Sequence, residues 1–305
     1  MGVVAPVLAT GPYRAARLGF RRDWEFIVSF IDLHPLRAVD DVTDAIAPTI
    51  PALTSACGAC RNGRSLPFDF TMAFQPIVDI VTGRTWAYEA LVRGIAGEGA
   101  GAILDRVSAD LIYGFDQACR VRAVEMAGAL FTPGDDVKLS INFMPNAVYE
   151  PNACIRATLA AAARVGFDKQ NLMFEFTENE RMRDVAHVRR IIAAYRAQGF
   201  TTALDDFGAG YAGLGLLAEL SPDVIKLDMA LIRGIDDSAV KRSIVRAVVG
   251  LCADLGILPV AEGIETPGEL AALRMLGVRL CQGYLIAHPA TGRLPIPFAD
   301  APLAA

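Results

Sequence analysis

The stretch MAFQPIVD-IVTGRT-WAYEALVR, residues 72–93, decides the fold. Its outer parts, 72–79 and 86–93, are apolar runs of strand length, rich in β-branched and aromatic residues. Only residues 80–85 separate them, and Gly83 supplies a turn-forming residue there. Because a crossover between parallel strands needs a dozen or more residues, the two runs predict an antiparallel hairpin.

Downstream of this hairpin, short strand-like runs alternate with longer segments of helical periodicity. The apolar residues Val185, Val188, Ile192 and Tyr195 recur at helical spacing, and 238–255 follows the same pattern. Six further strands are predicted at 137–143, 172–177, 202–206, 224–227, 258–262 and 280–285. Eight strands with intervening helices predict an α/β fold, a TIM-like (β/α)8 barrel with one antiparallel strand in the first hairpin. An open doubly wound sheet is the weaker alternative, because no glycine-rich phosphate loop follows the first strand.

The bulk composition limits the possible functions. The net charge of -5 argues against a DNA- or RNA-binding surface, which needs an excess of Lys and Arg. No apolar run approaches the roughly 20 residues of a membrane span, and the N-terminus lacks a signal-peptide pattern. We therefore expect a cytoplasmic protein that does not contact a membrane.

The first 66 residues differ from the rest, with Gly, Pro and Ala in irregular order. We expect residues 1–66 to form an irregular arm or a small appended element, and residues 67–305 to form the barrel domain. Cys57 and Cys60 have the spacing of a metal knuckle or a redox pair, although two thiols in an exposed linker are the simpler interpretation.

Acidic residues stand at the ends of several of the predicted strands. A carboxylate is costly to bury alone, and several together repel one another unless they are protonated or bind divalent cations. In a barrel of this kind the reactive face lies at the carboxyl ends of the strands. The carboxylates concerned are those of Glu89, Glu175, Asp205, Asp206 and Glu262, and Asn142 adds an amide carbonyl. All-oxygen ligation favours Mg²⁺ or Mn²⁺, and Asp205 could bridge two ions that hold a phosphate.

Lys226 lies within the strand-like run IKLD, 225–228. Lysine is rarely buried, and beside metal ions its pKa should fall, so that Lys226 could accept or relay the proton of an attacking water. The alternative is a structural ion pair with Asp228.

The same residues fall in motifs that occur in the order of a known family. The chain from about 68 to 297 resembles the EAL-domain family of cyclic diguanylate (c-di-GMP) phosphodiesterases. The matching motifs are FQPIVD (74–79), EALVR (89–93), INF (141–143), EFTE (175–178), LDDFG (204–208), IKLD (225–228), AEGIET (261–266) and QGY (282–284).

The resemblance implies hydrolysis of one phosphodiester of c-di-GMP to linear pGpG, two Mg²⁺ or Mn²⁺ ions per active site, and a homodimer through the barrel. It implies metal ligation by Glu89, Asn142, Glu175, Asp205, Asp206 and Glu262. Lys226, Glu89 and Glu262 correspond to catalytic positions, and Gln75, Leu91, Arg93 and Gln282 to substrate-binding positions. Glu178 corresponds to the residue that anchors the loop after the fifth strand, and Asp228 and Glu265 to supporting positions.

One loop departs from the family pattern. Ala209 and Ala212-Gly213 stand where the family commonly has Thr and Ser-Ser. Each lost hydrogen bond is worth on the order of 1 kcal/mol, so we expect altered loop stability with the chemistry retained. A non-catalytic c-di-GMP receptor is the alternative function. Such family members typically lose ligand carboxylates or the lysine, and this chain keeps them.

Overall fold

The structure is a computed structural model that describes residues 66–148, 150–177, 184–210 and 213–298. Its strands are β1 (Thr71–Asp79), β2 (Arg84–Arg93), β3 (Lys138–Asn142), β4 (Leu172–Thr177), β5 (Thr201–Phe207), β6 (Val224–Leu227), β7 (Leu258–Ala261), β8 (Leu280–Cys281) and β9 (Ala290–Thr291). Its α-helices are α1 (Ala100–Leu104), α2 (Ile112–Leu130), α3 (Pro151–Cys154), α4 (Arg156–Val165), α5 (Val185–Ala197), α6 (Gly213–Leu220), α7 (Met229–Ile232), α8 (Ala239–Leu255) and α9 (Pro267–Met275).

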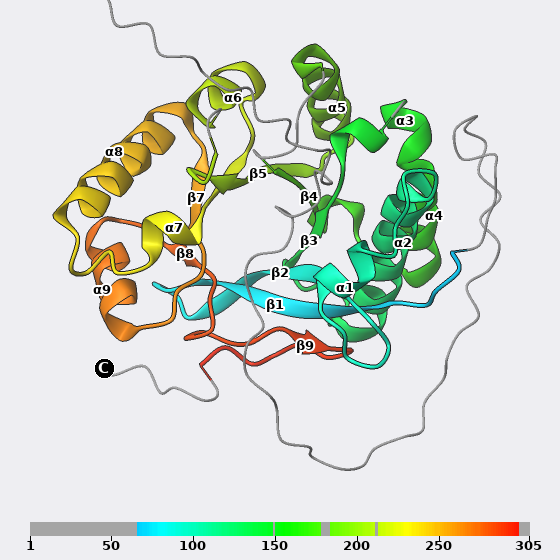
Figure 1. Cartoon of the computed structure of the whole chain (residues 1–305), viewed down its shortest axis with the longest axis horizontal. Helices are drawn as coiled ribbons and strands as arrows, with labels where there is room; N and C mark the ends of the chain where they lie inside the picture. Colours follow the sequence, from blue (N-terminus) through cyan, green and yellow to red (C-terminus); the bar gives the residue numbers. More distant parts are fainter. Residues whose placement is uncertain (1–65, 149, 178–183, 211–212, 299–305) are drawn as a thin grey trace, which may run out of the picture.

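The sheet closes into a barrel, as predicted. Strand β1 pairs antiparallel with β2, from Thr71 opposite Arg93 to Asp79 opposite Arg84, and it also pairs antiparallel with β8. The steps from β2 through β8 are parallel. The first strand is therefore the reversed one. The longer helices lie around the outside of the strands, and β9 runs alongside β1 (Figure 1).

An apolar floor closes the inside of the barrel. Side chains alternate along a strand, so residues two positions apart share a face. The floor consists of the buried residues Ile77, Ala87, Met173, Ala203, Val224, Val260 and Leu280. On the strands after the hairpin turn, each of these residues stands two positions before a predicted site residue, as Val224 does before Lys226. On the reversed β1 the order is inverted, and Ile77 follows Gln75. The predicted site residues therefore form the next layer of side chains inside the barrel, directly above the apolar floor.

Two strand predictions need correction. The eighth strand was expected over 280–285, but β8 ends at Cys281. The chain turns because Gly283 lies directly against the backbone of Ile264, where a Cβ would overlap the Ile264 oxygen and nitrogen. The hydrogen bonds from Ile264 N to Gln282 O and from Ile286 N to Gly283 O complete the turn. The second correction is β9, which was not predicted because two residues carry no periodicity.

The predictions for the N-terminal arm and for Cys57 and Cys60 lie outside the described residues, apart from Leu66. Among the helices of the described ranges, none has both the length and the apolar character needed to cross a membrane.

Candidate active site

A pocket of about 620 Å³ opens above the apolar floor, at the carboxyl ends of the parallel strands. Its walls hold most of the residues predicted from the sequence. They are Gln75, Glu89, Leu91, Arg93, Asn142, Asp205, Asp206, Lys226, Asp228, Glu262, Glu265 and Gln282. Glu175 lies behind this wall and has no exposed surface. Glu178 falls outside the described residues.

Lys226 stands at the centre of the site and is 1% exposed. Its Nζ lies 2.7 Å from Glu262 Oε1, 2.8 Å from Glu175 Oε2, 3.2 Å from Asp205 Oδ1 and 3.4 Å from Glu89 Oε2. Asp228, the partner considered in the sequence-based alternative, accepts a hydrogen bond from Ala230 N at the start of α7. Lys226 therefore offsets the negative charge of the carboxylates at this end of the barrel, and not that of Asp228 alone.

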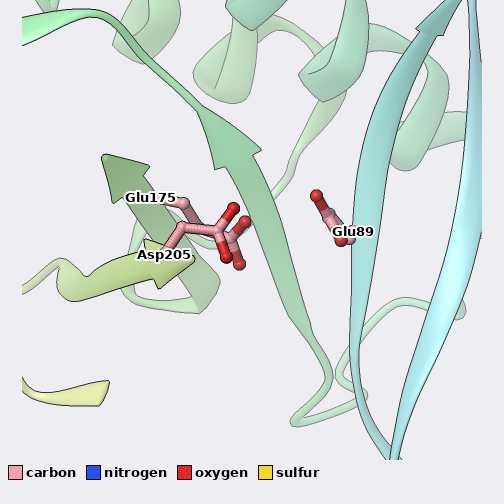
Figure 2. Close-up of side chains that lie close together, drawn as sticks. All are labelled: Glu89, Glu175 and Asp205. Carbon is pink, nitrogen blue, oxygen red and sulfur yellow. The ribbon is translucent and has the colours of Figure 1, made fainter. Parts of the chain in front are cut away.

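The carboxylates form two groups that share one member. Oxygens of Glu89, Glu175 and Asp205 lie within 4.8 Å of one another, and so do oxygens of Asp205, Asp206 and Glu262. Figure 2 shows the side chains of the first group approaching one another from separate strands. Carboxylate oxygens at this density are the donor set that hard divalent cations prefer, so the residues present fit such ions.

A local irregularity lets Asp205 and Asp206 both reach the site. The strand predicted over 202–206 ended with this pair of aspartates. The structure instead continues β5 to Phe207 and breaks the register with β6 between Leu204 and Phe207. Asp206 takes a left-handed conformation, with φ of 55°, and its carboxylate accepts a hydrogen bond from Thr177 Oγ1 at 2.9 Å. A bulge therefore replaces the expected strand end.

The pKa values in the site reflect burial and crowded charge. Burial and the neighbouring carboxylates raise the pKa of Glu175 to about 8, and burial and Asp205 raise that of Asp206 to about 7. Burial opposes ionisation of Glu89, but Lys226 and the amides of Gln282 and Asn142 hold its pKa below the usual value. Burial would also lower the pKa of Lys226, yet the surrounding carboxylates raise it well above its ordinary value. A lowered pKa for Lys226 therefore requires cations that neutralise those carboxylates.

Ser140 is a site residue that the sequence analysis missed. It lies on β3 at the level of the apolar floor, has no exposed surface, and its hydroxyl donates to Glu175 Oε1. A signal was present, because Ser140 stands two positions before Asn142 and must share its face. Asn142 Nδ2 donates to Glu89 Oε1 at 2.9 Å, so its amide oxygen is the atom left to bind a cation.

The predicted substrate and support residues line the rim. Gln282 Nε2 donates to Glu89 Oε2 at 2.8 Å and to Gln75 Oε1 at 3.2 Å, and Gln75 Nε2 donates to Ala287 O. Leu91 and Arg93 lie along the β2 side of the pocket. Glu265 pairs with Arg233. The structure thus links Gln75 and Gln282 to Glu89 by hydrogen bonds, and it places the other predicted contact and support residues separately around the same pocket.

The barrel with its reversed first strand carries a pocket lined by carboxylate and amide oxygens. The sequence profile of the EAL domain matches residues 61–289. The chain belongs to the EAL domain family.

Two curated relatives illustrate the similarity. The chain is 32% identical over 224 residues to the blue light- and temperature-regulated antirepressor BluF of Escherichia coli, covering 73% of this chain and 55% of BluF. It is 32% identical over 228 residues to the cyclic di-GMP phosphodiesterase PA2567 of Pseudomonas aeruginosa, covering 72% and 38% of the two proteins. The chain thus spans about half or less of the length of these relatives.

Two solved structures share the fold. One is the c-di-GMP-bound form of a standalone versatile EAL protein from Vibrio cholerae O395, with 52% identity, a TM-score of 0.72, and coverage of 76% of this chain and 96% of that one. The other is Klebsiella pneumoniae BlrP1 in a manganese and cyclic di-GMP complex, with 36% identity, a TM-score of 0.68, and coverage of 76% and 58%.

Proposed function

We propose that this chain is a phosphodiesterase specific for c-di-GMP, which hydrolyses one phosphodiester bond to give linear pGpG. The observation that carries the proposal is the joint arrangement of the two carboxylate groups, shared Asp205 and central Lys226 in one pocket. The names of PA2567 and of the c-di-GMP complexes support the substrate.

Two Mg²⁺ or Mn²⁺ ions are the proposed cofactors, as the manganese complex of BlrP1 supports. Glu89, Asn142, Glu175, Asp205, Asp206 and Glu262 would hold them, with Asp205 shared. When bound, such ions lower the pKa of water and offset charge on a phosphate. Among the described residues that line the pocket, carboxylates outnumber basic side chains, so an anionic diester needs this compensation to enter.

The remaining roles belong to side chains of the chain itself. Lys226 Nζ points into the carboxylates and is placed to orient a water and to hold or pass on its proton, with Glu89 and Glu262 as its neighbours. Gln75, Leu91, Arg93 and Gln282 are the proposed substrate contacts, with Asp228 and Glu265 in support. The pocket volume lies in the range typical of small-molecule sites.

A turnover assay tests the proposal. The purified chain is incubated with c-di-GMP and Mg²⁺ or Mn²⁺, and the product is identified by mass spectrometry. We expect pGpG, no turnover in EDTA, and recovery when the ion is restored in excess. The variant Asp205→Asn should lose activity with both ions, whereas Glu125→Gln, which alters a surface ion pair, should not. Binding of c-di-GMP without turnover under either ion would contradict the proposal.

A non-catalytic c-di-GMP receptor is the second candidate, since one relative is named an antirepressor. It predicts c-di-GMP binding of undiminished affinity in EDTA, with no product in the assay above. Isothermal titration with and without the chelator distinguishes the two functions.

A homodimer through the barrel, a cytoplasmic location and the division into residues 1–66 and 67–305 are further predictions from the sequence. Sedimentation of the full chain tests the dimer.

A further inference from the structure

A buried charged network joins helices α2 and α5, and one of its members, Asp116, lines the pocket. On α2, the Nη2 of Arg120 donates to Asp116 Oδ2 at 2.6 Å, and Arg120 Nη1 lies 3.5 Å from the hydroxyl of Tyr195 on α5. All three residues are at most 3% exposed. The two helices are therefore tied together by one guanidinium group.

This network reaches the segment that follows the predicted ligand Asn142. The second oxygen of Asp116 accepts a hydrogen bond from Met144 N at 3.0 Å. Phe143 lies between Asn142 and Met144. Its backbone N donates to Glu175 O at 2.9 Å, and its ring packs on Tyr195 with centroids 5.5 Å apart. The extended segment 142–144 is thus held by the backbone of Glu175 on one side and by Asp116 and Tyr195 on the other.

The choice of residues argues for a positional role. A buried ion pair adds little net stability, because desolvation offsets the attraction, whereas apolar residues would fill the same space. A guanidinium instead offers several donors in a rigid planar arrangement, which fixes Asp116 relative to α5. The Asp116 carboxylate in turn fixes the position of the Met144 amide, and with it the backbone of Asn142 two residues earlier.

We infer that Arg120 is a positioning residue, which acts through Asp116 and the Met144 amide to hold Asn142 in the geometry of a divalent-cation ligand. This inference rests on the proposed function, because it assigns Asn142 to the cation site. Arg120 does not line the pocket, and it contributes by orienting the backbone of segment 142–144 through Asp116.

The test compares Arg120→Met with Arg120→Lys, Tyr195→Phe and the matched control Arg164→Met. Arg164 belongs to an exposed ion pair between α4 and α2, so its loss removes a charge without changing the contacts of segment 142–144. Mn²⁺ affinity is measured by isothermal titration, and exchange of the Phe143 and Met144 amides by mass spectrometry without added metal. Where c-di-GMP is hydrolysed, kcat and KM are measured separately.

We expect Arg120→Met to weaken Mn²⁺ binding by about 10–100-fold, the usual effect of removing a group that orients a ligand. The Met144 amide should exchange faster, and kcat should fall by a larger factor than KM changes. Arg120→Lys should fall between Arg120→Met and the wild type, Tyr195→Phe should show the smallest loss, and Arg164→Met none. Should Arg120→Met fail to fold, Mn²⁺ affinity and amide exchange are compared between Arg120→Lys, Tyr195→Phe and the wild type instead.

Unchanged Mn²⁺ affinity in a folded Arg120 variant would overturn the inference, as would a wild-type protein that binds no Mn²⁺. If the wild type binds Mn²⁺ without hydrolysing c-di-GMP and the affinity series still holds, the proposed function fails and the positioning role stands. If c-di-GMP is hydrolysed but all variants bind Mn²⁺ with wild-type affinity, the positioning role is wrong and the proposed function stands.

Discussion

Lys226 Nζ lies 2.8 Å from Glu175 Oε2, with the lysine side chain 1% exposed and the glutamate side chain fully buried. Because both groups are shielded from solvent, each depends on neighbouring protein groups to offset the cost of its burial. The same lysine contacts Glu89, Asp205 and Glu262. The site without ions therefore depends on one cationic side chain.

Replacing Lys226 should show how far the buried carboxyl groups of the site depend on its charge. We expect Lys226→Met to reduce the free energy of unfolding in EDTA by about 3–5 kcal/mol, because it leaves buried carboxylates without their partner. Excess Mn²⁺ should recover part of this loss, while turnover stays at least about 100-fold below wild type. Urea unfolding with and without Mn²⁺ measures the first effect. The exposed Lys169→Met is the control, and equal stability of the two variants in EDTA would contradict the prediction.

The Ser140 hydroxyl should matter although it does not line the pocket. Ser140→Ala removes the donor to Glu175 Oε1 and leaves a buried carboxylate oxygen unpaired, at a cost of about 1–3 kcal/mol in unfolding free energy. We also expect Mn²⁺ affinity to fall by about 10–100-fold, because Glu175 loses the contact that orients it. Chemical denaturation and isothermal titration measure the two effects. Ser243→Ala, at an exposed position of α8, should change neither.

The turn at Gly283 should tolerate no side chain. A Cβ at this position overlaps the backbone of Ile264, two residues beyond Glu262. We expect Gly283→Ala to destabilise the protein by about 1–3 kcal/mol or more and to lower turnover by displacing Glu262. Gly250→Ala, in α8 with open space around it, should instead be neutral or slightly stabilising. Thermal unfolding of both variants checks the contrast, which a wild-type melting temperature for Gly283→Ala would refute.

Tyr195 should contribute to the loss of stability at alkaline pH. Burial raises its pKa from 10.0 to about 12, although the charge of Arg120 partly opposes the shift. A folded-state pKa above the unfolded one gives a stabilising contribution that is complete below pH 10 and is lost as the pH rises through about 12. Tyr195→Phe should therefore show a flatter decline in unfolding free energy between pH 10 and 11.5.

Urea unfolding across that pH range measures the slopes. Burial also raises the pKa of Cys281 to about 12 and that of Cys252 to about 11. Both thiols are present in both proteins, so the difference between the slopes isolates Tyr195. Parallel curves would show that Tyr195 ionises as easily in the folded state as in the unfolded one.

Much of this arrangement could be predicted from the sequence because it follows from simple periodicity and loop length. The six-residue connection after Asp79 excluded a parallel first pair, and the carboxylates at strand ends indicated the reactive face. Ser140 could have been found from its place two positions before Asn142 on the same strand face. Two features could not be predicted. The bulge at Asp206 depends on a backbone conformation that several residue types adopt, and Arg120 on α2 meets Tyr195 on α5 only after folding.

The reversal of β1 also determines where the chain enters the barrel. Because β1 is antiparallel to β2, its first residue Thr71 pairs with Arg93 beside the pocket, and the chain leaves toward β2 at the far end. With a parallel first strand, the chain would enter at the end away from the catalytic side. Ahead of Thr71, Phe68 and Phe70 are buried and pack on Phe115, which lines the pocket. A pull on the chain at Leu66 would therefore reach the pocket first through these ring contacts.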